Sequence, residues 1–152
     1  MLSPYRVLDL TNEEGLLCGQ ILADLGADVI AVEPPGGSSA RRLGPFVDGI
    51  RDPNGSLFWW AYSRNKRSLT VDLETETGRA CLRELVRNSD FLIESFPAGH
   101  LDALGLGYAA LRQLNPRLVM VSITAFGGEG PKAHYVATDL IALAASDRKS
   151  VV

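Results

Sequence analysis

The segment from Met1 to Glu33 constrains the fold most strongly, because it contains the patterns of a strand, a helix and a second strand in quick succession. Residues 6–10 (RVLDL) form a short apolar run of the kind found in a buried parallel strand. Apolar residues then recur at helical spacing as far as Gly26, which can end a helix in the left-handed conformation, and residues 28–33 (DVIAVE) follow as a strand. This order predicts a right-handed crossover between two parallel strands.

The alternation of strands and helices continues along the rest of the chain. The further elements expected are strands over residues 68–73, 91–94 and 117–124, and helices over residues 76–88, capped by Thr75, and 108–114. The sequence therefore predicts an α/β fold with an open, mostly parallel sheet and flanking helices. In such folds ligands bind at the carboxyl ends of the strands, which is where candidate site residues are expected.

Residues 34–54 are rich in Gly, Pro, Ser and Arg, and they predict a long loop that covers a site. The aromatic cluster over residues 58–62 either packs over an edge of the sheet, which is the commoner outcome, or stacks on a planar ligand. Basic residues in and after the loop either contact phosphate groups or carry solvated charge. These residues are Arg41, Arg42, Arg64, Lys66 and Arg67.

The composition narrows the class of protein. The chain has 152 residues, of which 46% are hydrophobic and 22% are charged, and this fits one soluble globular domain. A net charge of -3 provides no positive field for nucleic acid or anionic lipid, so neither is expected as a partner. No apolar run approaches the roughly 20 residues of a membrane-spanning helix, and the start of the chain lacks a secretory signal pattern. We therefore expect a cytoplasmic protein without membrane contact.

The cysteines and histidines favour neither a disulfide nor a metal site. Cys18 and Cys81 lie far apart in expected helices, where reduced thiols in the core are the simplest interpretation. His100 and His134 are isolated, with no second ligand at a spacing that suits a metal, and they are expected in loops or on the surface.

A dinucleotide-binding site is disfavoured by the segment that follows the first strand. Its fingerprint requires three glycines at fixed spacing, whereas residues 12–19 read NEEGLLCG. Glu13 and Glu14 would also repel a pyrophosphate. Glu33 does stand where a ribose-binding acid would lie, but this position alone is weak support.

Asp139 stands directly before the apolar run 140–145, and therefore at the start of an expected helix. One interpretation is a helix cap, provided by Asp139 itself or by Thr138. The other is a nucleophile that stays ionised at the positive end of the helix. Periodicity alone leaves both interpretations open.

Several segments together resemble the class III CoA transferases, the family of formyl-CoA transferase, carnitine CoA-transferase and the CaiB/BaiF proteins. The segments occur in the family's order and spacing across nearly the whole chain, and the set is far more specific than any single member. The matching segments are residues 7–11 (VLDLT), 22–30 (LADLGADVI), 33–36 (EPPG), 65–68 (NKRS), 71–73 (VDL), 90–96 (DFLIESF), 104–108 (LGLGY), 114–117 (LNPR), 121–127 (VSITAFG) and 138–140 (TDL).

The resemblance implies a Rossmann-like domain in an interlocked homodimer that passes CoA from an acyl-CoA donor to a carboxylic acid acceptor. It implies no metal and no tightly bound cofactor, because CoA and acyl-CoA take part as substrates. At the position of Asp139 the family has an aspartate that attacks the thioester, forms a mixed anhydride and then carries CoA as an aspartyl thioester. The resemblance therefore favours the nucleophile interpretation of Asp139.

The resemblance also implies contacts to CoA. The positions that match contacts to the nucleotide or the pantetheine are Val71, Ser95, Phe96 and Thr124. Some relatives use basic residues toward the phosphates at positions that are occupied here by Pro34, Glu74 and Ala103. Two interpretations stay open: either other cations replace them, with Lys66 and Arg67 as the assigned CoA contacts and Arg41 and Arg42 as alternatives, or the affinity for CoA is low.

This sequence also departs from the family. Residues 12–18 differ from the usual transferase loop, which leaves the substrate class open. Because family members are much longer, residues 1–145 are assigned to the amino-terminal part of the large domain. Residues 146–152 are assigned to an atypical tail of foreign or frameshifted origin. The truncated chain is expected to be inactive. Two alternatives stay open. One is the acyl-CoA racemase branch, which has a histidine at the position of Thr138, and the other is a non-catalytic fragment.

Overall fold

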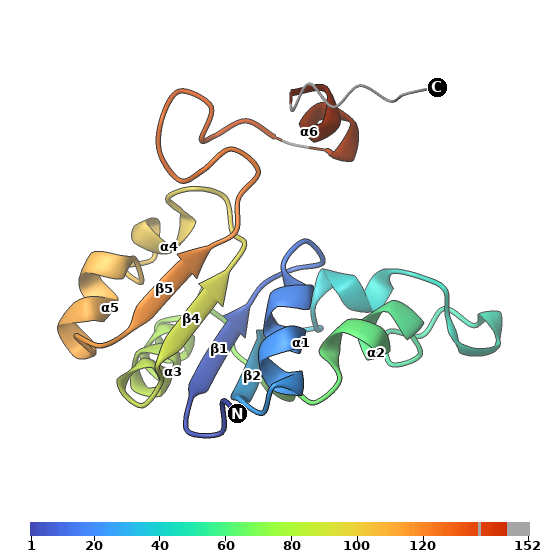
Figure 1. Cartoon of the computed structure of the whole chain (residues 1–152), viewed down its shortest axis with the longest axis horizontal. Helices are drawn as coiled ribbons and strands as arrows, with labels where there is room; N and C mark the ends of the chain where they lie inside the picture. The colour runs from blue at the N-terminus through green and yellow to red at the C-terminus, as the bar shows by residue number, and fades with distance from the viewer. Residues whose placement is uncertain (137, 146–152) are drawn as a thin grey trace.

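The computed structural model describes residues 1–136 and 138–145, and within these ranges five parallel strands form one sheet (Figure 1). The strand order is β3-β2-β1-β4-β5. The strands are β1 (Arg6–Leu10), β2 (Asp28–Glu33), β3 (Arg67–Thr70), β4 (Phe91–Glu94) and β5 (Val119–Ser122). The predicted α/β fold with an open, parallel sheet is confirmed. The predicted tail over residues 146–152 lies outside the described residues.

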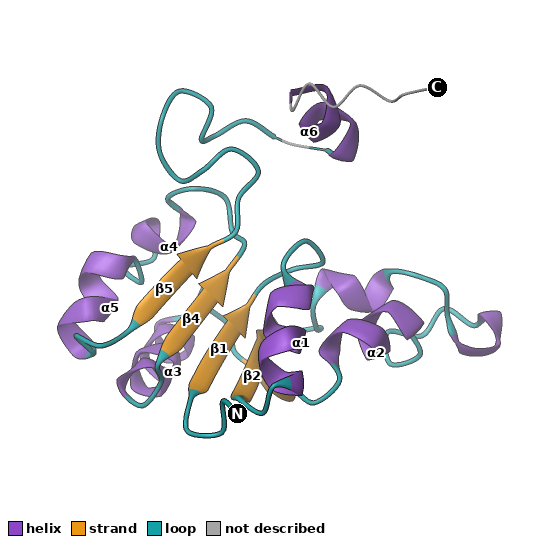
Figure 2. Ribbon diagram, in the orientation of Figure 1, coloured by secondary structure: helices purple, strands orange, loops and turns teal. Residues whose placement is uncertain are grey.

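Helices cover both faces of the sheet, as right-handed crossovers require. α1 (Leu16–Asp24) and α2 (Leu57–Ser63) lie on one face, whereas α3 (Glu76–Arg87) and α5 (Tyr108–Leu114) lie on the other (Figure 2). This division follows from the strand order, because the chain moves from β1 to β3 in one direction and then returns across the sheet to β4.

Alternate strand residues point to opposite faces and fill two apolar layers. The layer beside α1 contains Val7, Val29 and Ile93 with Ala23 and Ala27. The layer beside α3 and α5 contains Leu8, Ile30 and Leu92 with Leu82, Val86 and Leu111. Each fully buried Leu or Ile side chain contributes roughly 1.5–3 kcal/mol relative to an exposed one, so these layers hold the strand ends in fixed positions.

Capping residues set the starts of two helices. Thr75 Oγ1 accepts a hydrogen bond from Gly78 N at 3.1 Å, which confirms the predicted cap of α3. Ser56 Oγ accepts from Trp59 N at 3.1 Å and begins α2, a helix that the sequence pattern does not predict. The aromatic cluster therefore lies on this helix, where Trp59 packs in a buried cluster with Leu16.

The prediction that both cysteines are core thiols is wrong for Cys81, which is exposed. The buried face of α3 follows Gly78, Leu82 and Val86 at four-residue spacing, and Cys81 lies outside this line. Cys18 is half-buried, and burial raises the pKa of its thiol.

The chain leaves the sheet after β5. A loop leads beyond the carboxyl ends of the strands to α6 (Asp139–Ala145), and α4 (His100–Ala103) forms a single turn after β4 (Figure 1). In residues 1–136 and 138–145, none of the helices is long and apolar enough to cross a bilayer.

Candidate functional site

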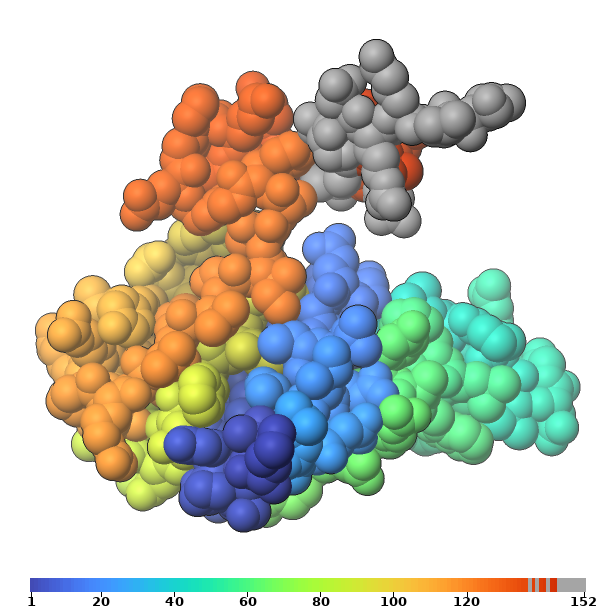
Figure 3. All heavy atoms as spheres, viewed as in Figure 1, coloured from blue at the N-terminus to red at the C-terminus, as the bar shows by residue number. Residues whose placement is uncertain are grey.

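Phe96, which follows β4, lines four cavities at the carboxyl edge of the sheet. Their volumes are about 630, 390, 270 and 130 Å³. The 630 Å³ cavity lies between β5 and the helices α4 and α5, and the 390 Å³ cavity lies at the ends of β1 and β2. The 270 Å³ cavity lies between the loops after β1 and β5, where the surface is hollowed between the blue and orange segments in Figure 3. The 130 Å³ cavity lies between the end of β2 and the segment after β3.

The cavities surround the place where the chain direction across the sheet reverses, between β1 and β4. Ligands of open parallel sheets bind at such a point, because the loops after the two strands diverge there. The loops are joined by Asn12 and Ser95: Asn12 N donates to Ser95 Oγ at 2.8 Å, and Ser95 Oγ donates to Asn12 Oδ1 at 2.8 Å. Ser95 therefore fixes the loop after β1, a role that its position in the sequence does not reveal.

The structure brings the remaining strand-end residues of the predicted CoA site together around Phe96. Val71 is buried and lines the 130 Å³ cavity, and Thr124 lines the 630 and 270 Å³ cavities. Ser95 lines the 270 Å³ cavity. The predicted positions at the ends of the strands thus lie at one edge of the sheet and line neighbouring cavities.

His100 is a site residue that the sequence pattern does not identify. Its ring packs against Phe96 with a centroid distance of 4.7 Å and an interplanar angle of 31°. Both rings line the 630 and 130 Å³ cavities, so the pair forms the wall between them. Phe96 lies before α4, whose first residue is His100, so no helical spacing in the sequence links the two side chains.

Lys66 and Arg67, which are expected to contact the CoA phosphates, both pair with carboxylates of this chain. Lys66 Nζ donates to Asp9 Oδ2 and to the Leu16 carbonyl oxygen, both at 2.8 Å, and its side chain is only 1% exposed. Arg67 begins β3 and pairs with Asp28 at 2.6 Å, at the amino end of the sheet. One cation is enclosed and the other lies at the opposite end from the cavities.

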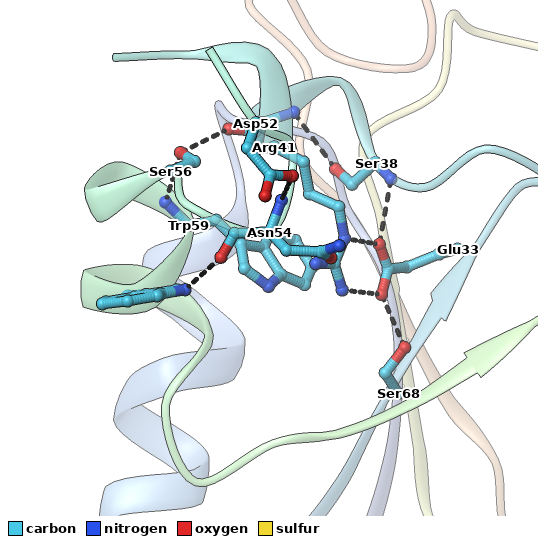
Figure 4. A network of polar contacts seen from close by, with 10 residues as sticks. Glu33, Ser38, Arg41, Asp52, Asn54, Ser56, Trp59 and Ser68 are labelled. Atoms are coloured by element: carbon cyan, nitrogen blue, oxygen red, sulfur yellow. Dashed lines mark hydrogen bonds and ion pairs between the residues drawn. The ribbon is translucent and has the colours of Figure 1, made fainter. Parts of the chain in front are cut away.

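Arg41 is held by Glu33 at the end of β2 (Figure 4). Its guanidinium donates to both carboxylate oxygens, with Nη2 2.8 Å from Oε1, and stacks over the Trp59 ring at 4.0 Å from the ring centroid. Burial alone would raise the pKa of Glu33, but hydrogen bonds from Arg41, the Ser68 hydroxyl and the Ser38 amide lower it below its ordinary value. Glu33 therefore anchors the loop after β2 and is not free for a ribose.

The backbone of Asp139 begins α6, as predicted, and its side chain lies outside the part of the structure that is described. Ile141 N donates to Thr138 Oγ1 at 3.4 Å, so Thr138 supplies a cap for this helix. His134 lines the 270 Å³ cavity. No group of three or more His, Cys, Asp or Glu side chains in the described ranges is placed to hold a metal ion.

Comparisons with known proteins show which family this chain is similar to. The model of CoA-transferase family III matches residues 2–148. Over 144 residues the chain is 44% identical to the succinyl-CoA:(R)-benzylsuccinate CoA-transferase subunit BbsE of Thauera aromatica. This alignment covers 95% of this chain and 35% of the relative. Over 144 residues it is 45% identical to the succinate–glutarate CoA-transferase of Agrobacterium fabrum, with 92% and 36% covered.

The fold is also that of a solved relative. A crystal structure of a CaiB/BaiF family protein from Brucella suis matches with a TM-score of 0.85 and 41% identity, covering 95% of this chain and 38% of that one. The chain thus spans little more than a third of the length of these relatives, which confirms the predicted truncation relative to the family. From the match over nearly all of its length, we conclude that the chain belongs to CoA-transferase family III.

Proposed function

We propose that this chain forms the CoA-binding part of an enzyme that transfers CoA from an acyl-CoA donor to a carboxylic acid. The observation that carries the proposal is the position of Phe96, which lines four cavities at the switch point together with Val71, Ser95 and Thr124. These are the positions that the family resemblance assigns to CoA. Their gathering at one strand edge supports a single extended ligand rather than separate sites.

In this proposal the adenine ring lies in the 130 Å³ cavity between Val71 and the Phe96–His100 pair. Aromatic rings stack on bases at a gain of about 1–3 kcal/mol per base, and both rings line this cavity. The pantetheine then extends along the edge past Thr124 into the 270 Å³ cavity. This path leads from β4 toward the loop that precedes α6.

Asp139 is the proposed nucleophile. Its carboxylate attacks the thioester carbonyl, a C–O bond forms as the C–S bond breaks, and the CoA thiolate leaves a mixed anhydride behind. The thiolate attacks the aspartyl carbonyl and releases the donor acid, so that CoA is held as an aspartyl thioester. The acceptor carboxylate then attacks this carbonyl, expels the thiolate and forms a second mixed anhydride. The thiolate finally attacks the acyl carbonyl of the acceptor, which yields the acceptor's CoA thioester and restores the Asp139 carboxylate. Each step exchanges one activated acyl group for another.

The acids are proposed to be dicarboxylates. The two relatives named above act, by their names, on succinyl-CoA with benzylsuccinate and on succinate with glutarate. We further propose that turnover requires the remaining part of the family fold in a cytosolic homodimer, and that the 152-residue chain binds CoA without turnover.

Two experiments test the proposal. Isothermal titration of the 152-residue chain with CoA is expected to give saturable binding, and absence of binding at millimolar CoA contradicts it. The product of the complete gene, incubated with succinyl-CoA and hydroxylamine, is expected to carry a hydroxamate at Asp139. Trapping at another carboxylate, or CoA transfer that survives Asp139→Ala, would refute the role of Asp139.

A further inference from the structure

The structure leaves one of the candidate phosphate-binding cations available at the cavities. CoA carries phosphate groups on its nucleotide, and the strand-end residues Pro34 and Glu74 offer them no positive charge. Arg41 is occupied by Glu33, Lys66 is enclosed with Asp9, and Arg67 lies at the amino end of β3. Arg64 pairs with Asp24 at 3.0 Å, so of the basic residues considered in the sequence this leaves Arg42, in the loop after β2.

Arg42 lines the 390 Å³ cavity and is exposed. It ends the short 3-10 turn Ser39–Arg42, directly after the buried Ala40 and the clamped Arg41, which fix its backbone. An added Cβ at Gly36 would lie 3.9 Å from Arg42 Nη2, so the guanidinium lies beside the glycine turn after β2. This turn needs glycine, because Gly36 has a φ of +86°.

The acids of the same cavity are already neutralised. Asp9 and Glu33 both line it, but Asp9 pairs with Lys66 and Glu33 pairs with Arg41. No carboxylate in residues 1–136 pairs with Arg42, and Glu13 is in contact with the Ser39 hydroxyl of the same turn. Among the charged side chains that line this cavity, Arg42 is therefore the one that has no partner of opposite charge in residues 1–136.

The 390 Å³ cavity adjoins the proposed adenine cavity. Both are lined by Val32, Pro34 and Phe96, so a group bound beside Arg42 lies across the end of β2 from a ring bound beside Val71. We propose that Arg42 binds a phosphate group of the CoA nucleotide at this cavity, an inference that rests on the proposed function. The planar guanidinium suits this role because it can give two parallel hydrogen bonds to one phosphate.

Titration of the 152-residue chain with CoA and with pantetheine, which has no phosphate, tests the proposal. Arg42→Gln is expected to weaken CoA binding about tenfold or more, as the loss of a hydrogen bond between charged groups does, and to leave pantetheine binding unchanged. Arg51→Gln is the matched control, because Arg51 is also exposed, lies in the same connection between β2 and α2, and lines none of the four cavities. Unchanged thermal unfolding of both variants confirms that they are folded.

The outcomes separate this inference from the proposed function. An Arg42→Gln chain with wild-type CoA affinity, or with equal losses for CoA and pantetheine, overturns the role of Arg42 while CoA binding itself stands. An equal loss of CoA affinity in Arg51→Gln also overturns it, because the general electrostatic field of the chain, rather than a contact with Arg42, would then explain the loss. A wild-type chain that binds neither compound contradicts the proposed function as well.

Discussion

Lys66 Nζ lies 2.8 Å from Asp9 Oδ2, and both side chains are 1% exposed. The pair joins the end of β1 to the residue before β3, and Lys66 also donates to the Leu16 carbonyl oxygen at the start of α1. Asp9 Oδ1 in turn accepts from Thr11 N and Thr11 Oγ1, at 3.1 and 2.6 Å. This buried network fixes the direction in which the chain leaves β1, and so the position of the loop that closes the cavities.

Breaking this ion pair should cost far more than breaking a surface pair. Lys66→Met is expected to lower the free energy of unfolding by about 3–5 kcal/mol, because it leaves the Asp9 carboxylate buried without its partner. Arg67→Met removes the neighbouring cation from an exposed pair and should cost less than about 1 kcal/mol. Urea unfolding of both variants measures the difference, and equal losses would show that Lys66 is not the anchor described here.

Gly19 is the point at which α1 approaches this network most closely. A Cβ added there would lie 2.0 Å from Asp9 Oδ2 and 3.1 Å from Lys66 Nζ, so the carboxylate must move. Gly19→Ala is expected to destabilise the chain by about 1–3 kcal/mol, despite the higher helix propensity of alanine. Gly128→Ala, where nothing lies within 4 Å of the added carbon, is the control and should be nearly neutral. A stabilised Gly19→Ala chain would contradict the close packing.

The Glu33 carboxylate should make stability depend on acid pH. Its pKa in the folded chain is lower than its ordinary value of 4.5, so the unfolded chain binds the proton more tightly. The stabilisation is therefore fully present above about pH 4.5 and is lost as the pH falls through the lower, folded pKa. Glu33→Gln should reduce stability at pH 7 and flatten the profile below pH 4.5. Glu84→Gln, which changes an exposed carboxylate, should keep the wild-type profile.

Removing the Phe96 ring should weaken CoA binding more than it weakens the fold. Phe96→Ala is expected to raise the Kd for CoA by about 5-fold to 150-fold, the equivalent of one stacked base. Tyr5→Ala removes a partly exposed ring at the amino end of β1 and should leave the Kd unchanged. Titration calorimetry compares the two, and an unchanged affinity in Phe96→Ala would exclude the adenine position proposed above.

The sequence predicts the elements that are defined by local burial. β1, β2 and β4 have the expected bounds, because each is an apolar run that is buried on both faces of the sheet. Thr75 caps α3 as expected, since a cap depends only on the next three residues. α2 is missed because its aromatic residues also suit a strand, and Ser56 is the only local signal of its start.

The sequence predicts those site residues that directly follow a strand, but not those whose role depends on a partner far away in the chain. Val71, Phe96 and Thr124 fall at strand ends, and the parallel sheet brings these ends together. The partners of Lys66 and Arg67 could not be foreseen, because Asp9 and Asp28 lie far away in sequence and only the strand order brings them close. Lys66 and Arg67 are neighbours in sequence, but their partners lie at opposite ends of the sheet.

Mapping by NMR tests whether CoA binds at the carboxyl ends of β3, β4 and β5. In a titration of the ¹⁵N-labelled 152-residue chain with CoA, we expect the largest amide shifts in residues 71–74, in the non-proline residues of 95–100 and in Thr124, which line the cavities after β3, β4 and β5. Shifts that gather instead at the amino ends of the strands, around Tyr5 and Arg67, or the absence of shifts at saturating CoA, would contradict it.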